Sequence, residues 1–256
     1  MKIAVCIKQV PDTASILKLK NESLQLDRDA AENVMNELDE YAVEAALQLA
    51  EQNEGSTVTV VSMGPEKTGE TIRKALSMGV DDGLHLTDPL LSGADAFVTS
   101  YALAHLLKER HFDLIMFGAG STDSGMSVIP SMVAEQLGLP QLTSVRTITL
   151  DGTYVSAERV TDSYTGTVTA SMPAVASVVE KANEPRYPSF KGIMAAKKKP
   201  VEVLSAHDAG LFPELNSLCM VVDAAPLPPK PAGTVITDDG TAATKIADYL
   251  SEQKFI

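Results

Sequence analysis

The sequence predicts an α/β fold with a doubly wound, mainly parallel, Rossmann-like sheet, to which antiparallel strands and an extended C-terminal arm are added. Two observations support this prediction. In the first half of the chain, short apolar segments alternate with longer segments whose apolar residues recur at helical spacing, and the connections are short. In the second half, alternating segments separated by turn residues replace this pattern. We expect residues 1–200 to form one α/β domain and residues 201–256 to form the arm.

Each element of the first half has its own signature. Lys2–Ile7 is a continuous apolar run, typical of a parallel strand that is buried on both faces, and Thr57–Ser62 is rich in β-branched residues. Gly83–Leu86 is a weaker third strand, and Asp113–Phe117 is a fourth. Helical spacing follows each strand, over residues 36–49, 66–78, 94–108 and 126–137. Such repeats place ligand sites at the carboxyl ends of the strands.

The second half begins with a hairpin signal. Val145–Leu150 and Tyr154–Val160 alternate on either side of Asp151-Gly152, a dipeptide that favours a tight turn. Thr165–Ser171 and Ala174–Val179 are two further strand candidates. We expect these segments to extend the sheet as antiparallel strands. A small additional hairpin is expected earlier in the chain, between residues 16–19 and 24–26.

The regular pattern fades beyond Lys181. Two prolines in Asn183–Pro188 exclude a long helix there, and the lysines of Lys197–Lys199 are expected to form a solvated stretch. Residues 226–231 are proline-rich and favour an extended connector, whereas residues 241–253 have the pattern of a last helix. Because this tail carries only scattered apolar residues, it either packs on the main domain or lies on another chain.

Composition excludes several classes of protein. The chain has 34 Asp and Glu residues against 21 Lys and Arg, so its net charge of −13 would repel a phosphate backbone, and no nucleic-acid partner is expected. Cys6 and Cys219 have no metal-ligand spacing and are too few for a disulfide framework. No apolar stretch approaches the ~18 residues of a membrane span. We therefore expect a cytoplasmic protein without membrane insertion and without a metal site.

No catalytic constellation is visible in the sequence. The histidines belong to none of the common hydrolase or metal motifs. We expect His105 on a helix and the others in loops or at strand edges; they are His85, His111 and His207. The acidic residues between Asp27 and Glu44 are expected mostly to form a solvated helix face, with Asn36 as its N-cap. The prediction is a protein without catalytic residues of its own.

The loop Gly118–Gly125 is the most informative segment. Glycines and hydroxyl side chains lead there from a strand into a helix N-terminus, where unpaired N–H groups favour an anion. Asp123 would repel a phosphate, so we expect it to cap the helix or to accept backbone donors. Two interpretations stay open: a phosphate-binding loop, or an ordinary turn with an Asp or Ser cap. Ser62–Pro65 and Lys8–Asp12 are expected at the same edge of the sheet, where Met63 and Gly64 either line an adenine slot or form a plain turn.

Several motifs in collinear order give the chain a family resemblance. Arg73–Gly79 and Asn183–Pro188 are the most specific of them. The others are Lys8–Asp12, Asn36–Glu44, Val61–Pro65 and Gly118–Pro130. Together they resemble the beta subunit of the electron transfer flavoprotein, over nearly the whole chain.

The resemblance implies an electron carrier made of an alpha and a beta subunit. In this family the carrier takes electrons from acyl-CoA and related dehydrogenases and passes them to a membrane quinone oxidoreductase. The FAD that carries the electrons lies mainly in the alpha subunit. The beta subunit holds a structural AMP on an adenine-nucleotide-binding fold, and its C-terminal arm wraps the alpha subunit.

The resemblance also implies site residues. By position, the AMP-binding residues are Cys6, Asn36, Glu37, Leu38, Asp39, Met63, Gly118, Ala119, Gly120, Ser121, Thr122, Asp123, Ser124, Gly125, Met126, Ser127, Val128 and Ile129. The contact of Cys6 would be made by its backbone. Thr13 and Leu38 match the flavin-facing positions, where family members often carry aromatic residues that this chain lacks. The residues expected to recognise partner dehydrogenases are Tyr187, Phe190, Ile193 and Met194.

Three alternatives remain. A bifurcating member of the family would hold a second FAD in place of AMP, although the loop here reads Ser121–Ser127 where such members carry an Asp-Gly-Asp-Thr-like stretch. An adenine-nucleotide-hydrolysing enzyme is suggested by a superficial likeness of Gly118–Ser124 to the loop of AMP-forming ATP pyrophosphatases, but that loop should follow the first strand. A nucleotide-sensing module without redox work is the third.

Overall fold

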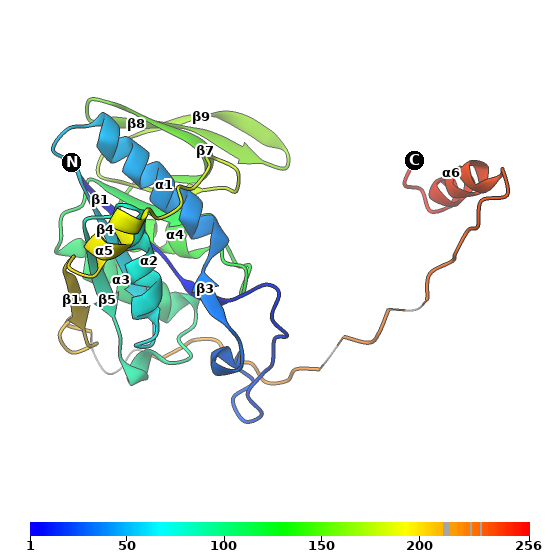
Figure 1. Cartoon of the computed structure of the whole chain (residues 1–256), viewed down its shortest axis with the longest axis horizontal. Coiled ribbons are helices and arrows are strands. Elements are labelled where there is room, and N and C mark those ends of the chain that lie inside the picture. Colours follow the sequence, from blue (N-terminus) through cyan, green and yellow to red (C-terminus); the bar gives the residue numbers. More distant parts are fainter. Residues whose placement is uncertain (212–215, 226, 231) are drawn as a thin grey trace. The chain divides into compact units, whose positions relative to one another are not determined.

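The computed structural model describes residues 1–211, 216–225, 227–230 and 232–256. The chain divides into two compact units, Met1–Val222 and Asp223–Ile256. The first unit contains a nine-stranded sheet in the order β11-β5-β4-β1-β6-β10-β7-β8-β9 (Figure 1). Its strands are β1 (Lys2–Cys6), β4 (Thr57–Met63), β5 (Asp82–Leu86), β6 (Leu114–Gly118), β7 (Gln141–Asp151), β8 (Tyr154–Thr161), β9 (Tyr164–Ser171), β10 (Ala174–Val178) and β11 (Val201–Leu204). The predicted α/β class with a mainly parallel sheet is confirmed.

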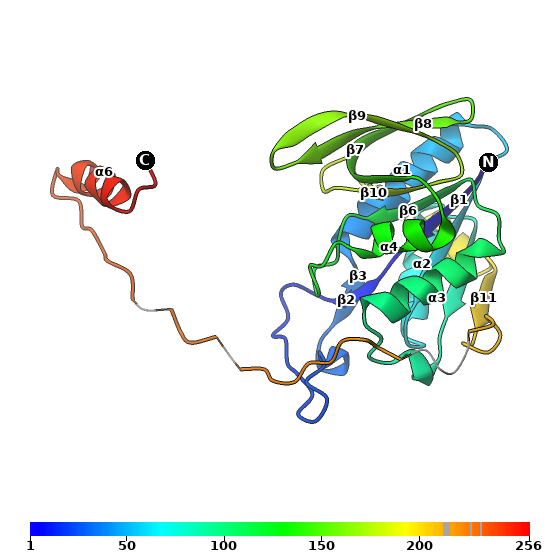
Figure 2. The ribbon, with the colours of Figure 1, turned by 180° about the vertical axis from the view of Figure 1, so that it is seen from behind.

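Helices cover both faces of this sheet. The helices α1 (Glu37–Gln52), α2 (Thr68–Met78) and α5 (Phe190–Ala196) lie on one face (Figure 1). The helices α3 (Ala96–Lys108) and α4 (Ile129–Leu137) lie on the other (Figure 2). Alternate residues of β1 enter two separate cores: Ile3 and Val5 pack under α1 and α2, whereas Ala4 and Cys6 pack under α3 and α4. This double burial explains why the strand is apolar at every position from Ile3 to Cys6.

The strand β10 corrects one expectation. We expected Ala174–Val179 to extend the sheet as an antiparallel strand, but β10 lies between β6 and β7 and is parallel to both. All five of its residues are buried; four are apolar, and the fifth, Ser177, accepts a hydrogen bond from the N–H of Ser144, so the strand does not show an alternating pattern. The expected antiparallel strands are β8 and β9, and the hairpin at Asp151-Gly152 joins β7 to β8 as predicted.

Several short elements escaped the sequence pattern. The strands β2 (Gln9–Pro11) and β3 (Asn33–Met35) form a two-stranded antiparallel ladder, and the expected hairpin before β3 is reduced to one bridge between Leu19 and Leu26. Two 3-10 turns, η1 (Arg28–Ala30) and η2 (Pro89–Leu91), were also unexpected.

The edge of the domain lies beyond the expected boundary at residue 200. Residues 201–204 form the edge strand β11, which pairs with β5, so they belong to the sheet and not to an arm. The second unit contains the expected last helix, α6 (Ala242–Glu252), on which Ile246 and Tyr249 are about half exposed. Pro226 and Pro231, at the ends of the expected extended connector, lie outside the described residues. Within the described ranges, no helix is both long enough and apolar enough to cross a membrane.

Candidate functional site

The candidate site lies where the order of the sheet reverses. From β1 the chain moves outward to β4 and β5, and it then returns to place β6 on the other side of β1. The ends of these strands lie side by side, with Cys6 paired in register with Phe117. The helices that follow β1 and β6 lie on opposite faces, so the loops after the two strands diverge and leave a crevice. Open α/β sheets bind their ligands in such a crevice.

Asp39 ties the two strand ends together. Its carboxylate accepts a hydrogen bond from the backbone N–H of Lys8 at 2.7 Å and another from that of Gly118 at 3.2 Å. The side chain comes from the first turn of α1 and is almost fully buried. Burial raises the pKa of Asp39 to about 7, against the opposing effect of these hydrogen bonds. The expectation that the acidic residues of this stretch mostly face solvent is therefore wrong for Asp39, and also for the buried Glu44.

Gly118 is in contact with the start of α1. A Cβ atom at this position would lie 2.8 Å from the carbonyl carbon of Leu38 and would also collide with the Asp39 carboxylate. The position therefore requires glycine for close packing. The same is true of Gly64 after β4, where a Cβ atom would collide with the hydroxyl of Thr68. Met63, at the end of β4, is partly buried beside this turn.

Asn36 holds the loop that begins at Gly118. It occupies the N-cap position of α1, as predicted, but its side chain makes no capping bond. Its amide nitrogen donates to the carbonyl oxygen of Gly120 at 2.8 Å, and its amide oxygen accepts from the N–H of Thr122 at 3.1 Å. A fully buried side chain thus fastens the middle of the loop to the helix.

Asp123 has a different role from the one that we expected. It does not cap α4, because that helix starts at Ile129 with Val128 as its N-cap residue. Its side chain is only 2 % exposed and forms ion pairs with Lys8, at 2.8 Å, and with Arg28. Burial opposes ionisation of Asp123, but the Lys8 ammonium and the Arg28 guanidinium outweigh it and lower its pKa to about 2. Because two cations surround one carboxylate, the local charge of this trio is positive.

The remainder of the loop is tightly turned and partly open to solvent. The hydroxyls of Ser121 and Ser124 lie 2.8 Å apart, and a Cβ atom on Gly120 would come within 2.5 Å of the Ser127 hydroxyl. Gly125 has a positive φ of 61°, which favours glycine. Other loop residues expected in the site are partly buried or exposed: Ala119, Thr122, Met126, Val128 and Ile129.

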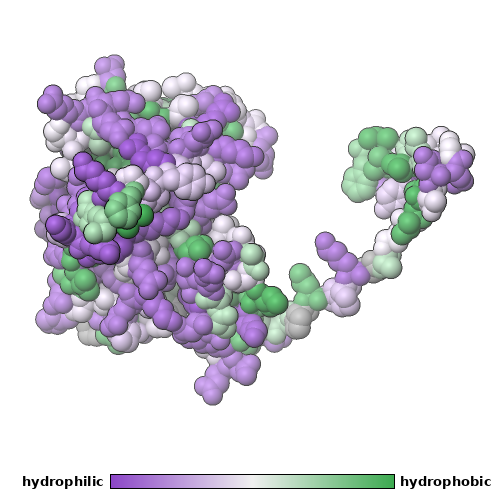
Figure 3. All heavy atoms as spheres, viewed as in Figure 1, coloured by the Kyte–Doolittle hydropathy of each residue, from purple (hydrophilic) through white to green (hydrophobic). Residues whose placement is uncertain are grey.

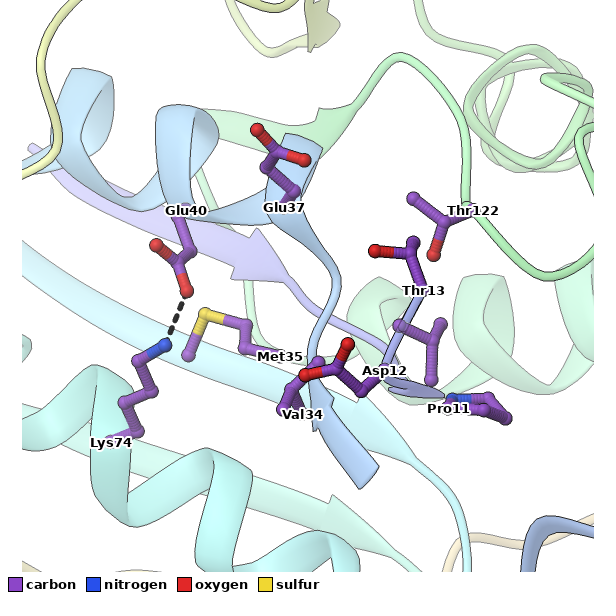
Figure 4. Close-up of a pocket in the computed structure, with 10 residues that line it drawn as sticks. Pro11, Asp12, Thr13, Val34, Met35, Glu37, Glu40, Lys74 and Thr122 are labelled. Atoms are coloured by element: carbon purple, nitrogen blue, oxygen red, sulfur yellow. Dashed lines mark hydrogen bonds and ion pairs between the residues drawn. The ribbon is translucent and has the colours of Figure 1, made fainter. Parts of the chain in front are cut away.

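A cleft of about 240 Å³ opens beside this loop (Figure 4). Thr13, Thr122, Glu37 and Met35 are among the residues that line it. Lys74 of α2 and Glu40 of α1 also line it and form an ion pair with each other. The structure thus brings Thr13, one of the two expected flavin-facing positions, next to the candidate site, while Leu38 is partly buried in the first turn of α1.

Two other residues considered in the sequence, Cys6 and His85, have buried side chains. Cys6 is a free cysteine, and burial raises the pKa of its thiol. His85 was expected in a loop or at a strand edge, but it lies buried within β5, and its Nε2 is 3.1 Å from the carbonyl oxygen of Gly64. In the part of the chain that the structure describes, no group of three or more His, Cys, Asp or Glu residues could hold a metal ion.

A second feature protrudes from the domain. Tyr187 and Phe190 are 95 % and 80 % exposed, and Ile193 and Met194 are about half exposed. We name these four residues the α5 patch. A hydrophobic area over α5 is visible in Figure 3. The patch contains all four residues that we expected at a partner surface.

The α5 patch stands on a firm base that the sequence did not reveal. The side chain of Arg73, from α2, donates to the carbonyl oxygens of Ala196 and Lys199, both at 2.7 Å. The ammonium of Lys199 donates to the carbonyl oxygen of Leu76, in the last turn of α2, at 3.2 Å and to that of the C-cap residue Gly79 at 3.1 Å. The lysine run was expected to be solvated, but this member of it closes the end of a helix. The only sign of these contacts in the sequence is the run of lysines that follows residue 196.

Comparisons with known proteins agree with this architecture. The electron transfer flavoprotein domain family matches residues 23–209. The electron transfer flavoprotein subunit beta of Mycobacterium leprae is 47 % identical over 264 aligned positions, which cover 99 % of each chain. The corresponding subunit of Syntrophomonas wolfei is 37 % identical, covering 98 % of this chain and 96 % of its own. Subunit CarD of the caffeyl-CoA reductase-Etf complex of Acetobacterium woodii is 33 % identical with the same coverage. The chain therefore belongs to the electron transfer flavoprotein family, among its beta subunits.

Proposed function

We propose that this electron-transfer protein works as one half of a heterodimer, in which it holds an AMP molecule at the carboxyl edge of its sheet. The partner is an electron transfer flavoprotein alpha subunit. The observation that carries the proposal is the loop after β6, which Asn36 and Asp39 fasten to the start of α1. This arrangement brings the glycines and hydroxyls of the loop to the switch point of the sheet, where a nucleotide phosphate would bind.

The charge of the site supports an anionic ligand. The sequence raised one objection, because Asp123 would repel a phosphate. Lys8 and Arg28 neutralise that carboxylate, and the trio itself keeps one positive charge. The hydroxyls of Ser121, Thr122 and Ser124 would complete the phosphate site, and Met63 would contact the adenine.

The FAD of the alpha subunit would supply the electron chemistry, because its isoalloxazine ring accepts and releases electrons when it is bound. This chain would form part of the surface that surrounds the flavin. Thr13 would lie at the flavin, and its small side chain would leave room beside the ring rather than stack on it. Leu38 would pack behind it.

We further propose that the α5 patch docks dehydrogenases of the acyl-CoA type, from which electrons pass through the carrier to a membrane quinone oxidoreductase. Exposed aromatic side chains on a fixed base are typical anchors of protein interfaces. The arm would wrap the alpha subunit, and the exposed apolar residues beyond residue 217 support this role; they include Leu218, Met220, Val222, Leu227 and Val235.

A second FAD in place of AMP is the competing proposal, and the similarity to CarD, a subunit of a reductase-Etf complex, is the observation in its favour. Acid extraction of the co-purified heterodimer, followed by chromatography of the released nucleotides, separates the two. We expect about one FAD and one AMP per heterodimer. Two FAD molecules without AMP would establish the competing proposal, and a colourless chain without an alpha subunit would refute both.

A further inference from the structure

Arg186 joins the segment before α5 to helix α1. Its Nε and Nη2 atoms donate to the two carboxylate oxygens of Glu44 at 2.7 and 2.9 Å, and its backbone N–H donates to the same carboxylate at 3.1 Å. Its Nη2 also reaches Glu51, about two turns further along α1, at 3.2 Å. Just before it, the amide of Asn183 donates to the carbonyl oxygen of Tyr41 at 2.9 Å.

These ion pairs hold their geometry because one carboxylate is buried. Glu44 is almost inaccessible to solvent, and burial opposes its ionisation, but hydrogen bonds from Arg186 and Gln48 outweigh burial and lower its pKa. The hydrogen bonds to Glu44 and Glu51 in turn raise the pKa of Arg186. A planar guanidinium that binds a carboxylate through two parallel hydrogen bonds permits one orientation only.

The far end of α5 is fixed independently. Gly192 packs so closely on the carbonyl oxygen of Ser77 that a side chain would collide with it, and Arg73 holds the carbonyl oxygen of Ala196. Tyr187 and Phe190 therefore lie between two attachments, with Arg186 on α1 before them and the contacts with α2 after them.

We infer that Arg186 is a positioning residue for partner docking, which acts by holding Tyr187 and Phe190 in the orientation that the dehydrogenase receives. The inference rests on the proposed docking role of the α5 patch. A hydrophobic anchor on a rigid base loses less conformational freedom on binding than the same anchor on a loose loop. Arg186 itself need not touch the partner.

The test uses the complete heterodimer with Arg186→Met and Arg186→Lys. A matched control is Arg146→Met, because Arg146 makes a similar two-pronged pair with Glu158, at 3.0 and 2.9 Å, on the β7–β8 hairpin. The readouts are hydrogen exchange of the amides 187–196 and the KM for the carrier, with an acyl-CoA dehydrogenase as electron donor. We expect Arg186→Met to accelerate exchange and to raise KM roughly tenfold with FAD content unchanged. Arg186→Lys should show a smaller increase in exchange and in KM than Arg186→Met, and Arg146→Met should change neither readout.

A double variant decides whether Arg186 acts through the patch. If it does, Arg186→Met should add less than about twofold to the KM of Phe190→Ala, because the anchor that it positions is already gone. Independent, multiplying effects would overturn the inference, as would unchanged exchange or unchanged KM in Arg186→Met. If Phe190→Ala alone left KM unchanged, the docking proposal itself would fail and the inference would fall with it.

Discussion

Two regions of the molecule are held by helix α1, and they differ in the groups that they bury. At the first turn of the helix, Asn36 and Asp39 bury polar groups in order to shape a crevice. Along the middle of the same helix, Glu44 and Tyr41 secure a segment that exposes apolar groups. Both regions lie far from α1 in sequence, since the bonds of Asn36 span 84 residues and those of Glu44 span 142. One helix thus serves as a common frame, and its polar side chains position two surfaces of opposite character.

The largest effect is expected from a substitution that disrupts the packing of the crevice. Gly118→Val places a branched side chain against the backbone of Leu38 and the carboxylate of Asp39, so we expect a loss of about 4 kcal/mol or more of unfolding free energy. Co-purification and nucleotide extraction should show loss of AMP and of the alpha subunit. Gly69→Ala is the control, because a Cβ atom on Gly69 meets nothing within 4 Å. Full AMP occupancy in Gly118→Val would contradict the assignment of the site.

A smaller effect concerns the pH dependence of the crevice. The pKa of Asp39 is raised by burial to about 7, so the stability that it contributes is complete below the ordinary carboxyl pKa and declines as pH rises through 7. Asp39→Asn removes this dependence. Urea unfolding at a series of pH values should show the advantage of the parent chain over the variant shrinking by about 3 kcal/mol between pH 4 and pH 8. A constant difference across this range would show that Asp39 is not protonated in the folded chain.

The next effect tests the exposed surface alone. Phe190 is 80 % exposed, so Phe190→Ala should leave stability, FAD content and AMP content unchanged. The proposed loss of an anchor should raise the KM of a dehydrogenase for the carrier roughly tenfold, about 1.4 kcal/mol of binding. Leu90→Ala removes another exposed apolar side chain, outside the patch, and should have no such effect. Equal rates for both variants would remove Phe190 from the partner surface.

The smallest expected effect sharpens the comparison at the base of the α5 patch. Lys199→Met removes the ammonium that binds the carbonyl oxygens of Leu76 and Gly79 at the C-terminal end of α2, at a cost of about 1 kcal/mol. Lys198→Met, one residue earlier, changes an exposed lysine and is the matched control. Thermal unfolding of the heterodimer measures the difference. Identical midpoints for the two variants would show that this contact does not stabilise the base.

The sequence predicts the crevice better than the base of the patch, for a physical reason. The strands β1 and β4 are marked by runs of apolar or β-branched residues, and the helix α1 is long and periodic, so the local sequence pattern predicts them. The loop after β6 is marked by its glycines and hydroxyls. In contrast, α5 and β11 have seven and four residues, and tertiary contacts rather than local preference define them.

Individual buried charges were the other failure of prediction. Nothing in a run of acidic residues distinguishes Asp39 and Glu44, which turn inward, from their exposed neighbours. We expected Asp123 to cap a helix or to accept backbone donors, and the sequence does not reveal its two cationic partners, Lys8 and Arg28, because both are distant along the chain. Such pairings depend on the fold and become visible only when the strands are assembled.

The insertion of β10 between β6 and β7 has a consequence for synthesis of the chain. The two neighbours leave the ribosome first, followed by β8 and β9, and only then does the strand arrive that joins them. Until residue 178 has emerged, both flanking strands keep open edges that are able to pair with other nascent chains. The strands β7 to β9 therefore join the strands β1, β4, β5 and β6 in a single sheet only when this late strand has been made.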